Sequence, residues 1–288
     1  MKQLAPCTEN TVIAPYTSMR VGGPVRYLCR PETEEQFASL LEHCKAASMP
    51  FLVMGNASNL LFPDEGFDGA VIATGGIRGL TMDGDRITAL CGTSLSALSV
   101  FAMEHGRKGL AFAYGIPGTV GGGVYMNAGA YGGELSDCLE SIVCMDSAGK
   151  RMILNKEDLH LSYRHSRLQE EELYLLSATF LCETGDKAEI KAEMDRNMAS
   201  RKEKQPLEYP SCGSAFKRPV GHFAGALIQE AGLKGFSMGG AQVSDKHAGF
   251  VINKGGATAG EIKELLQYVC ETVYAKSGVV LEPEIQIL

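Results

Sequence analysis

Apolar residues recur three and four positions apart in several stretches of the chain, a spacing typical of amphipathic helices. In one stretch Phe37, Leu40, Leu41 and Cys44 fall on one face, behind a capping box of Thr33 and Gln36. In the last such stretch a stripe beginning at Ile262 follows a Thr258/Glu261 capping box and stops at Gly278. These patterns predict helices over residues 31–49, 93–106, 186–204, 222–232 and 258–278.

Short apolar runs bounded by turn residues predict strands between these helices. We expect strands over residues 50–55, 69–74, 86–92, 172–183, 248–253 and 279–288, with a hairpin over 140–154. After Pro283, alternation puts Glu284 and Gln286 on one face of the last strand. Strands and helices are mixed without strict alternation, which favours an α+β fold over a doubly wound α/β fold.

The charged helix and the proline-rich loop behind it mark the expected domain boundary. We therefore divide the chain into residues 1–184 and 185–288. A chain of 288 residues has ample length for two cores.

Composition and charge limit the classes of protein to which the chain can belong. The formal net charge of −7 argues against a nucleic-acid groove, and no apolar run approaches a membrane span. The first 20 residues lack the apolar centre of a signal peptide. Nine cysteines without a C-x-x-C pair predict reduced thiols in a cytoplasmic protein. The six histidines are dispersed, so we expect no metal site.

Two glycine-rich stretches, residues 54–61 and 115–134, are candidates for ligand binding. Backbone N–H groups in such loops can bind phosphate, and glycine lets the backbone approach a planar ligand. The side chains of Asn56, Ser58, Asn59 and Asn127 could bond a pyrophosphate or a ribose. Two long turns without a ligand are the alternative. Neither stretch matches a Rossmann or P-loop motif.

A third stretch, YPSCGSAFKRP over residues 209–219, reads as a fixed loop because two prolines bracket it. It holds Ser214 directly after Gly213 and close to Lys217 and Arg218. Buried packing is the expected role of Cys212. Arg164 and Glu284 are further polar candidates, although each alone could be a solvated surface residue. Their spacing in the sequence does not bring them together.

Seven ordered motifs, from about Asn10 to the last residue, resemble the UDP-N-acetylenolpyruvylglucosamine reductase family, also called UDP-N-acetylmuramate dehydrogenases. They are TSMRVGGP, MGNASNLL, GIPGTVGGGVYMNAGAYGGE, YRHSR, PSCGSAFKRP, GLKGFSMGGAQVSDKHAGFVIN and LEPEIQI. The short segment between Arg164 and Ser214 is similar to the subclass that lacks an inserted substrate-capping loop.

The resemblance implies a vanillyl-alcohol-oxidase-type (PCMH-type) FAD-binding module of two lobes over residues 1–184. It further implies a C-terminal α+β substrate-binding domain over residues 185–288, which carries Glu284 in the terminal strand. FAD would be non-covalent, since neither glycine-rich stretch contains a histidine. The implied FAD contacts are Gly55, Asn56, Ala57, Ser58, Asn59, Gly115, Ile116, Pro117, Gly118, Gly121, Gly122, Asn127, Ala128 and Gly129.

The implied reaction is NADPH-dependent reduction of UDP-N-acetylglucosamine enolpyruvate to UDP-N-acetylmuramate, a step of peptidoglycan precursor synthesis. Ser214 would donate the proton, with Arg164 and Glu284 stabilising the enolate-like charge, Glu284 being protonated or sharing a proton. Tyr163, Lys217, Lys246 and His247, with Arg218, are candidate substrate contacts. The implied protein is a cytoplasmic monomer. Another FAD-linked oxidase or dehydrogenase is the alternative, and a non-catalytic nucleotide-binding protein is a third reading.

Overall fold

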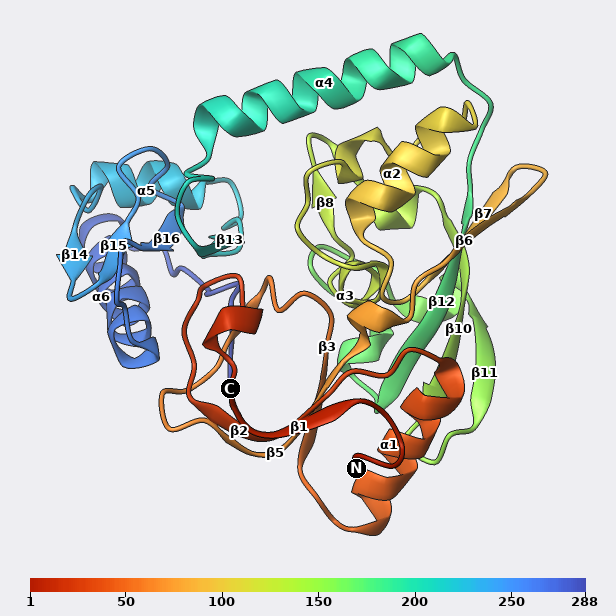
Figure 1. Cartoon of the computed structure of the whole chain (residues 1–288). Helices are drawn as coiled ribbons and strands as arrows, with labels where there is room; N and C mark the ends of the chain where they lie inside the picture. Colours follow the sequence, from red (N-terminus) through yellow and green to blue (C-terminus); the bar gives the residue numbers. More distant parts are fainter. The chain divides into compact units, whose positions relative to one another are not determined.

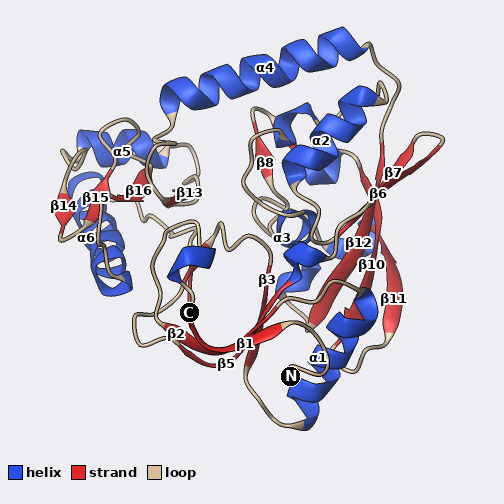
Figure 2. Cartoon of the chain, in the orientation of Figure 1, coloured by secondary structure: helices blue, strands red, loops and turns tan.

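The structure, a computed structural model, describes all 288 residues, which form six α-helices and seventeen β-strands (Figure 1). Figure 2 shows helix and strand mixed along the chain, which confirms the predicted α+β class. The chain forms two compact units. Unit 1 comprises Met1–Glu9, Tyr27–Asn56 and Gly69–Arg201, and unit 2 comprises Asn10–Arg26, Ala57–Asp68 and Lys202–Leu288.

These units differ from the contiguous division at residues 184/185. Helix α4 (Lys187–Lys204) lies in unit 1 over most of its length, and unit 2 takes two segments from the N-terminal part of the chain. The physical reason is burial: Met19, Val21 and Leu61 pack into the core of unit 2. Their local pattern is that of any buried apolar residue and does not reveal which core receives them.

Unit 1 is built on an antiparallel five-stranded sheet. Its strand order is β11 (Arg151–Asn155), β10 (Leu139–Asp146), β12 (Leu173–Leu181), β7 (Arg86–Leu90) and β6 (Leu80–Asp83). The predicted hairpin and the long apolar strand are therefore confirmed. Strand β12 is the centre of the sheet and is buried along most of its length, which accounts for its continuous apolar run.

Besides α4, three helices belong to unit 1. They are α1 (Glu34–Ala46), α2 (Leu95–Glu104) and α3 (Val120–Tyr125). The predicted face of α1 is buried, and the Thr33 side chain accepts a hydrogen bond from the N–H of Gln36. Six short 3₁₀ helices cover Ala14–Tyr16, Thr74–Gly76, Ala111–Ala113, Leu135–Asp137, Lys156–Leu159 and Arg167–Gln169.

A second sheet has the order β1 (Cys7–Val12), β2 (Pro24–Cys29), β5 (Phe67–Ala73) and β3 (Phe51–Met54). Cys7 and Cys29 form a disulfide, with their Cα atoms 4.1 Å apart. The expectation that all nine thiols are reduced is therefore wrong for this pair. The two cysteines lie 22 residues apart, and strand pairing brings them together, which spacing alone did not indicate.

Unit 2 contains an antiparallel sheet of order β13 (Ser211–Ser214), β16 (Phe250–Asn253), β15 (Ala241–Val243) and β14 (Ser237–Met238). Helices α5 (Ala224–Glu230) and α6 (Ala259–Ser277) belong to the same unit. The predicted Thr258/Glu261 capping box is present, and Gly278 ends α6 with φ 71°. The apolar stripe of α6 is buried in the core, as its spacing predicts.

The terminal strand is much shorter than predicted. Only β17 (Gln286–Ile287) has strand geometry, and it pairs in parallel with β4 (Leu60–Leu61). Pro283 interrupts the segment because proline has no N–H for a ladder. Ile285 is buried, whereas Ile287 is 42% exposed, so the expected alternation holds only in part. A small two-stranded sheet of β8 (Gly129–Ala130) and β9 (Gly133–Glu134) lies in unit 1.

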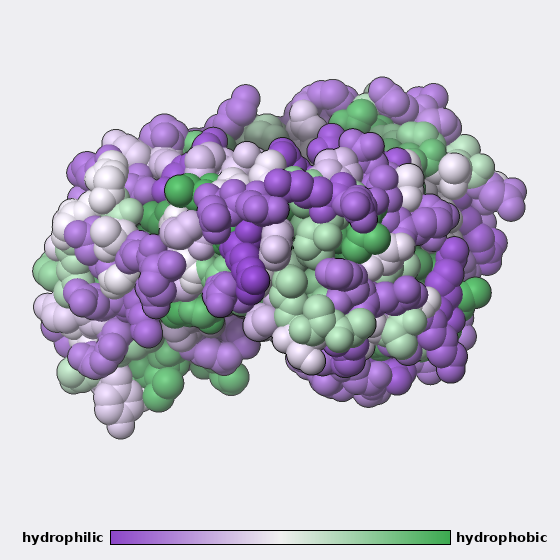
Figure 3. Space-filling view, turned by 60° about the horizontal axis from the view of Figure 1, so that its bottom comes forward, coloured by the Kyte–Doolittle hydropathy of each residue, from purple (hydrophilic) through white to green (hydrophobic).

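No helix combines the length and the apolar character that a bilayer crossing requires. Figure 3 shows polar side chains over most of the face that it draws, with apolar residues in small patches.

Candidate functional site

The two glycine-rich stretches meet in unit 1. The side-chain amide of Asn56 donates a hydrogen bond to the carbonyl oxygen of Pro117 at 2.9 Å. A Cβ added to Gly55 would lie 2.2 Å from Oγ1 of Thr119, so a larger residue here would require the Thr119 side chain to move. Two segments 61 residues apart in the sequence therefore lie in contact, as a shared ligand would require.

The second stretch begins with a turn at Gly115. Gly115 has φ 84°, and its N–H donates a hydrogen bond to Oγ of Ser96 at 3.0 Å. Thr119 then caps α3 by accepting a hydrogen bond from the N–H of Gly122. Sequence analysis did not single out Thr119, although a threonine before a glycine-rich helix is an N-cap signal.

The sequence predicted that backbone N–H groups of the second stretch bind phosphate, but the N–H groups of Gly121 and Gly122 in α3 are already bonded. The N–H of Gly121 donates to the carbonyl oxygen of Cys91 at 2.8 Å, and the N–H of Gly122 is taken by Thr119. Neither N–H is available to a phosphate. What these residues can offer a cofactor is the absence of a side chain, because Gly122 is exposed and Gly121 is half-buried.

Asn127 has a structural task. Its side chain is fully buried, and its amide donates to Oε1 of Glu134 at 3.0 Å and to the carbonyl oxygen of Ser162 at 3.1 Å. Its Oδ1 accepts from the N–H of Ser136. We expected this side chain to bond a pyrophosphate or a ribose, but its amide and its Oδ1 are already engaged within the protein. It holds the following Ala128–Gly129 segment in place instead.

Arg164 lies directly on this segment. Its Nη2 donates a hydrogen bond to the carbonyl oxygen of Gly129 at 3.2 Å, and its guanidinium lies 5.0 Å from the centre of the Tyr163 ring. Arg164 adopts the left-handed conformation, with φ 57°, which is uncommon outside glycine. Strained backbone of this kind is often found at functional sites. The structure thus brings the predicted catalytic arginine to the predicted cofactor segment.

The remaining part of the first stretch belongs to unit 2, where it contacts the terminal segment. The side-chain amide of Asn59 donates to the carbonyl oxygen of Glu284 at 2.9 Å, and the carbonyl of Asn59 accepts from the N–H of Gln286. Ala57 is buried with φ 46°. The amide of Asn59 therefore positions the backbone of Glu284.

Ser214 and Glu284 lie on neighbouring segments of unit 2. The N–H of Glu284 donates to the carbonyl oxygen of Ala215 at 2.8 Å, and the N–H of Lys217 donates to that of Glu282 at 2.9 Å. Ser214 ends strand β13 and is exposed. The expected loop is therefore a short strand with a bulge, in which Gly213 has φ 75°. Spacing could not reveal this pairing, because 70 residues separate the two side chains.

Three of the predicted substrate cations are partly engaged within unit 2. Lys217 forms an ion pair with Glu282. Nζ of Lys246 donates to the carbonyl oxygen of Lys202 at 2.8 Å. Burial lowers the pKa of His247, whose Nδ1 accepts a hydrogen bond from the N–H of Gly249 at 3.1 Å. His247 is therefore neutral at pH 7 and is not the cation that was expected.

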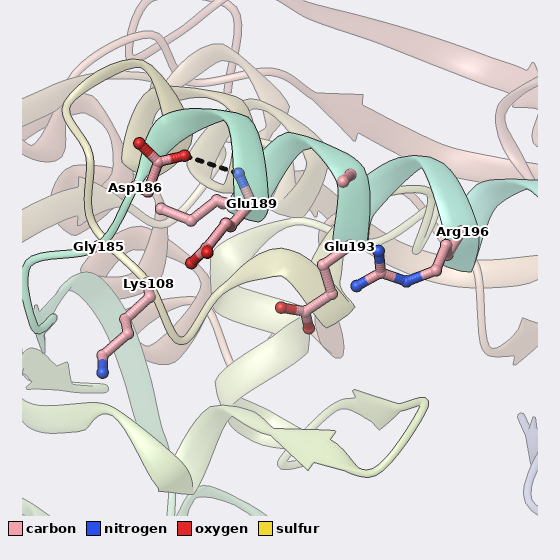
Figure 4. A pocket seen from close by; sticks show the side chains of 8 residues that line it. Lys108, Gly185, Asp186, Glu189, Glu193 and Arg196 are labelled. Carbon is pink, nitrogen blue, oxygen red and sulfur yellow. Dashed lines mark hydrogen bonds between the residues drawn. The ribbon is translucent and has the colours of Figure 1, made fainter.

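The sequence analysis expected the Cys212 thiol to pack against its neighbours. Burial raises the pKa of Cys212 to about 12, so this thiol packs the strand, as predicted, and does not react. A pocket of about 410 Å³ lies at the start of α4. Among the residues that line it are Lys108, Asp186, Glu189, Glu193 and Arg196 (Figure 4). None of the predicted site residues lines this pocket.

Comparison with known proteins identifies both parts of the chain. The family profile described as "FAD binding domain" matches residues 25–155. The profile "UDP-N-acetylenolpyruvoylglucosamine reductase, C-terminal domain" matches residues 205–288. The first match confirms the expected FAD-binding module, and the close approach at Gly55 and Thr119 fits a backbone surface for such a cofactor.

Individual relatives are similar over nearly the whole chain. A UDP-N-acetylenolpyruvoylglucosamine reductase of Lactobacillus delbrueckii subsp. bulgaricus is 47% identical over 97% of this chain and 94% of its own length. One of Caldicellulosiruptor bescii is 46% identical, covering 95% and 88% of the two chains. The crystal structure of the enzyme of that name from Thermus caldophilus superposes with a TM-score of 0.83, at 34% identity and 96% and 97% coverage.

Proposed function

Because the chain belongs to the UDP-N-acetylenolpyruvoylglucosamine reductase family, we propose that it reduces UDP-N-acetylglucosamine enolpyruvate to UDP-N-acetylmuramate with NADPH. The chain is an FAD-containing oxidoreductase of peptidoglycan precursor synthesis. The observation that carries the proposal is the hydrogen bond between Glu284 N–H and the Ala215 carbonyl oxygen, which places Ser214 and Glu284 on adjacent segments.

The cofactor surface consists of the joined glycine-rich stretches. These stretches would hold FAD, which would supply hydride-transfer chemistry between NADPH and the enolpyruvyl group. Gly55 and Gly115 let the backbone approach the cofactor, while Asn127 keeps the Ala128–Gly129 segment in place. The proposed contacts are Gly55, Asn56, Ala57, Ser58, Asn59, Gly115, Ile116, Pro117, Gly118, Gly121, Gly122, Ala128 and Gly129. No covalent tether is expected, because neither stretch contains a histidine.

Ser214 delivers the proton that completes the reduction. Hydride addition at the methylene carbon leaves negative charge at the adjacent carbon and in the substrate carboxylate. The exposed hydroxyl of Ser214 protonates that carbon, and the Gly213 bulge fixes its direction. Arg164, which lies on the Gly129 carbonyl, stabilises the developing charge as a cation. Glu284, held by Ala215 and Asn59, does so in its protonated form, as a hydrogen-bond donor.

The substrate diphosphate requires cations in unit 2. Arg218 lies two positions beyond Phe216 with its guanidinium 4.9 Å from the centre of the exposed Phe223 ring. Lys217 and Lys246 join it by exchanging their present carboxylate or carbonyl partners for phosphate oxygens. His247 contributes as a neutral donor through Nε2, and Tyr163 contacts the substrate or the nicotinamide. We further propose that the protein acts as a monomer in the cytoplasm.

The deciding experiment measures NADPH oxidation by the purified holoenzyme with and without the UDP-enolpyruvyl sugar. We expect oxidation to depend on the sugar and the product to be UDP-N-acetylmuramate. The alternative is an FAD-linked oxidase or dehydrogenase that acts on another alcohol or sugar. Sugar-independent turnover, with oxidation of such an alcohol, would support that alternative instead.

A further inference from the structure

A side chain that is not among the predicted site residues holds the backbone of Arg164. Gln169, in the short helix Arg167–Gln169, donates a hydrogen bond from Nε2 to the carbonyl oxygen of Arg164 at 3.1 Å. The same nitrogen donates to the carbonyl oxygen of Tyr125 at 2.7 Å. We propose that Gln169 is a positioning residue of the reaction, which fixes the backbone of Arg164 relative to the Ala128–Gly129 segment. The proposal rests on the proposed function, in which Arg164 stabilises the developing charge.

The contacts of Gln169 define which way its side-chain amide faces. Both neighbouring atoms are carbonyl oxygens, which only accept hydrogen bonds, so the nitrogen of the amide and not its oxygen must face them. An amide nitrogen carries two hydrogens, one for each carbonyl. Gln169 is half-buried, so water competes for these bonds less than it would at an exposed position. A side chain of similar length without an N–H group could replace neither bond.

Tyr125 joins this contact to the second glycine-rich stretch. It is the last residue of α3, and the carbonyl groups at the end of a helix have no partner within the helix. Its carbonyl oxygen accepts from Gln169 and also, at 2.8 Å, from Oγ of the buried Ser166. The chain continues from Tyr125 to Gly129, whose carbonyl oxygen accepts from Nη2 of Arg164. Gln169 therefore links the backbone of Arg164 to the chain segment that its guanidinium contacts.

The conformation of Arg164 explains why its backbone needs such a bond. Its φ of 57° lies in the left-handed region, which is unfavourable for a residue with a side chain and persists only where the surrounding structure determines it. Ser162 and His165 close the turn around Arg164 through mutual backbone hydrogen bonds of 3.2 and 3.1 Å. Those bonds fix the ends of the turn, whereas Gln169 acts on the carbonyl of Arg164 itself. Loss of the Gln169 bond should therefore let Arg164 leave this conformation and shift its guanidinium.

The test measures the two half-reactions of the holoenzyme separately by rapid mixing. Gln169→Met keeps the length of the side chain but has no N–H group, so reduction of the UDP-enolpyruvyl sugar by pre-reduced enzyme should slow roughly 10- to 100-fold. Flavin reduction by NADPH and the FAD content should stay normal. In an Arg164→Met background, Gln169→Met should have no further effect, because it acts through the arginine. Glu171→Gln is the matched control, since it breaks an ion pair with Arg167 in the same segment. Its rates should equal those of the wild type.

A normal second half-reaction in Gln169→Met, when Arg164→Met is slow, would overturn this proposal alone. Further slowing of Arg164→Met by Gln169→Met would show that Gln169 acts elsewhere, and would also overturn it. Equal slowing in Ser166→Ala would do the same, because it would assign the effect to the Tyr125 carbonyl. If Gln169→Met does not fold, Gln169→Ala takes its place in the same comparison. A wild-type protein that does not reduce the sugar, or a full rate in Arg164→Met, would overturn the proposed function together with this inference.

Discussion

The N–H of Glu284 donates a hydrogen bond to the carbonyl oxygen of Ala215 at 2.8 Å, so Glu284 lies across from the residue that follows Ser214. The second anchor of Glu284 is its own carbonyl, which accepts from the side chain of Asn59. These two hydrogen bonds fix the backbone of Glu284 and therefore the point from which its carboxyl group extends. The proposed acid chemistry depends on this arrangement.

Replacing Ser214→Ala should separate the two half-reactions. The hydroxyl is exposed at the end of β13, so its loss should leave the fold and FAD content unchanged. Flavin reduction by NADPH in stopped flow should stay normal, whereas reduction of the enolpyruvyl sugar should slow on the order of 100- to 10,000-fold. Normal steady-state turnover by this variant would remove Ser214 from the mechanism.

Replacing Glu284→Gln should produce the same separation, since the amide keeps the shape but loses the acid. Glu282→Gln is the matched control. Glu282 lies two residues before Glu284 in the same segment, and its carboxylate pairs with Lys217. We expect a large loss in the second half-reaction only for Glu284→Gln, measured by rapid mixing with pre-reduced enzyme. Equal effects of both variants would indicate a structural role for the segment.

Replacing Gly55→Ala should disturb the junction of the two glycine-rich stretches. The new methyl group would meet Oγ1 of Thr119 at 2.2 Å, and relief of this overlap should cost about 1–3 kcal/mol of stability. FAD affinity should fall as the stretches move apart, measured by titration of the apoprotein. Gly75→Ala is the control, because the nearest atom to its Cβ is 3.8 Å away. Equal FAD affinity in both variants would contradict a shared cofactor surface.

The Cys7–Cys29 disulfide should stabilise the protein through its 22-residue separation. Loop closure of this length is worth about 3 kcal/mol in the unfolded-chain entropy model. Cys7→Ser should therefore lower the thermal midpoint, and reductant should lower that of the wild type but not that of the variant. Cys270→Ser, which changes a free thiol, should leave the response to reductant intact. Alkylation of all nine cysteines in protein that was unfolded without reductant would contradict the disulfide.

His247 should make stability depend on pH. Its folded pKa lies below the unfolded value of 6.5, so the unfolded chain binds more protons in the window between the two values. Stability should be highest above pH 6.5 and should fall as the pH drops through this window. His247→Asn, which can still accept from the N–H of Gly249, should flatten this part of the urea-denaturation profile. An unchanged slope would mean that His247 keeps its ordinary pKa.

Local patterns predicted most of the secondary structure because local chemistry determines it. Helix α6 is the clearest case: its capping box, buried stripe and C-terminal glycine all lie within 21 residues. The short terminal strand was overestimated, since its hydrogen bonds depend on β4, which lies far away in the sequence. The compact units differ from the contiguous division for the same reason, because unit 2 takes in segments that are distant in the sequence.

The candidate site shows the same limit. The glycine-rich stretches could be located by composition, and the motifs located Arg164, Ser214 and Glu284. The engagement of Asn127 with Glu134 and Ser162, and the neutral state of His247, depend on burial that the residue types do not reveal.

The discontinuity of unit 2 has a consequence for biosynthesis. This unit combines Asn10–Arg26 and Ala57–Asp68 with a segment that extends to the final residue of the chain. On the ribosome, its earliest pieces must wait for the residues that follow Lys202, whereas all of unit 1 has been synthesised by Arg201. A nascent chain released soon after Arg201 would therefore hold the whole of unit 1 and leave the apolar side chains of Met19, Val21 and Leu61 open to chaperones and proteases.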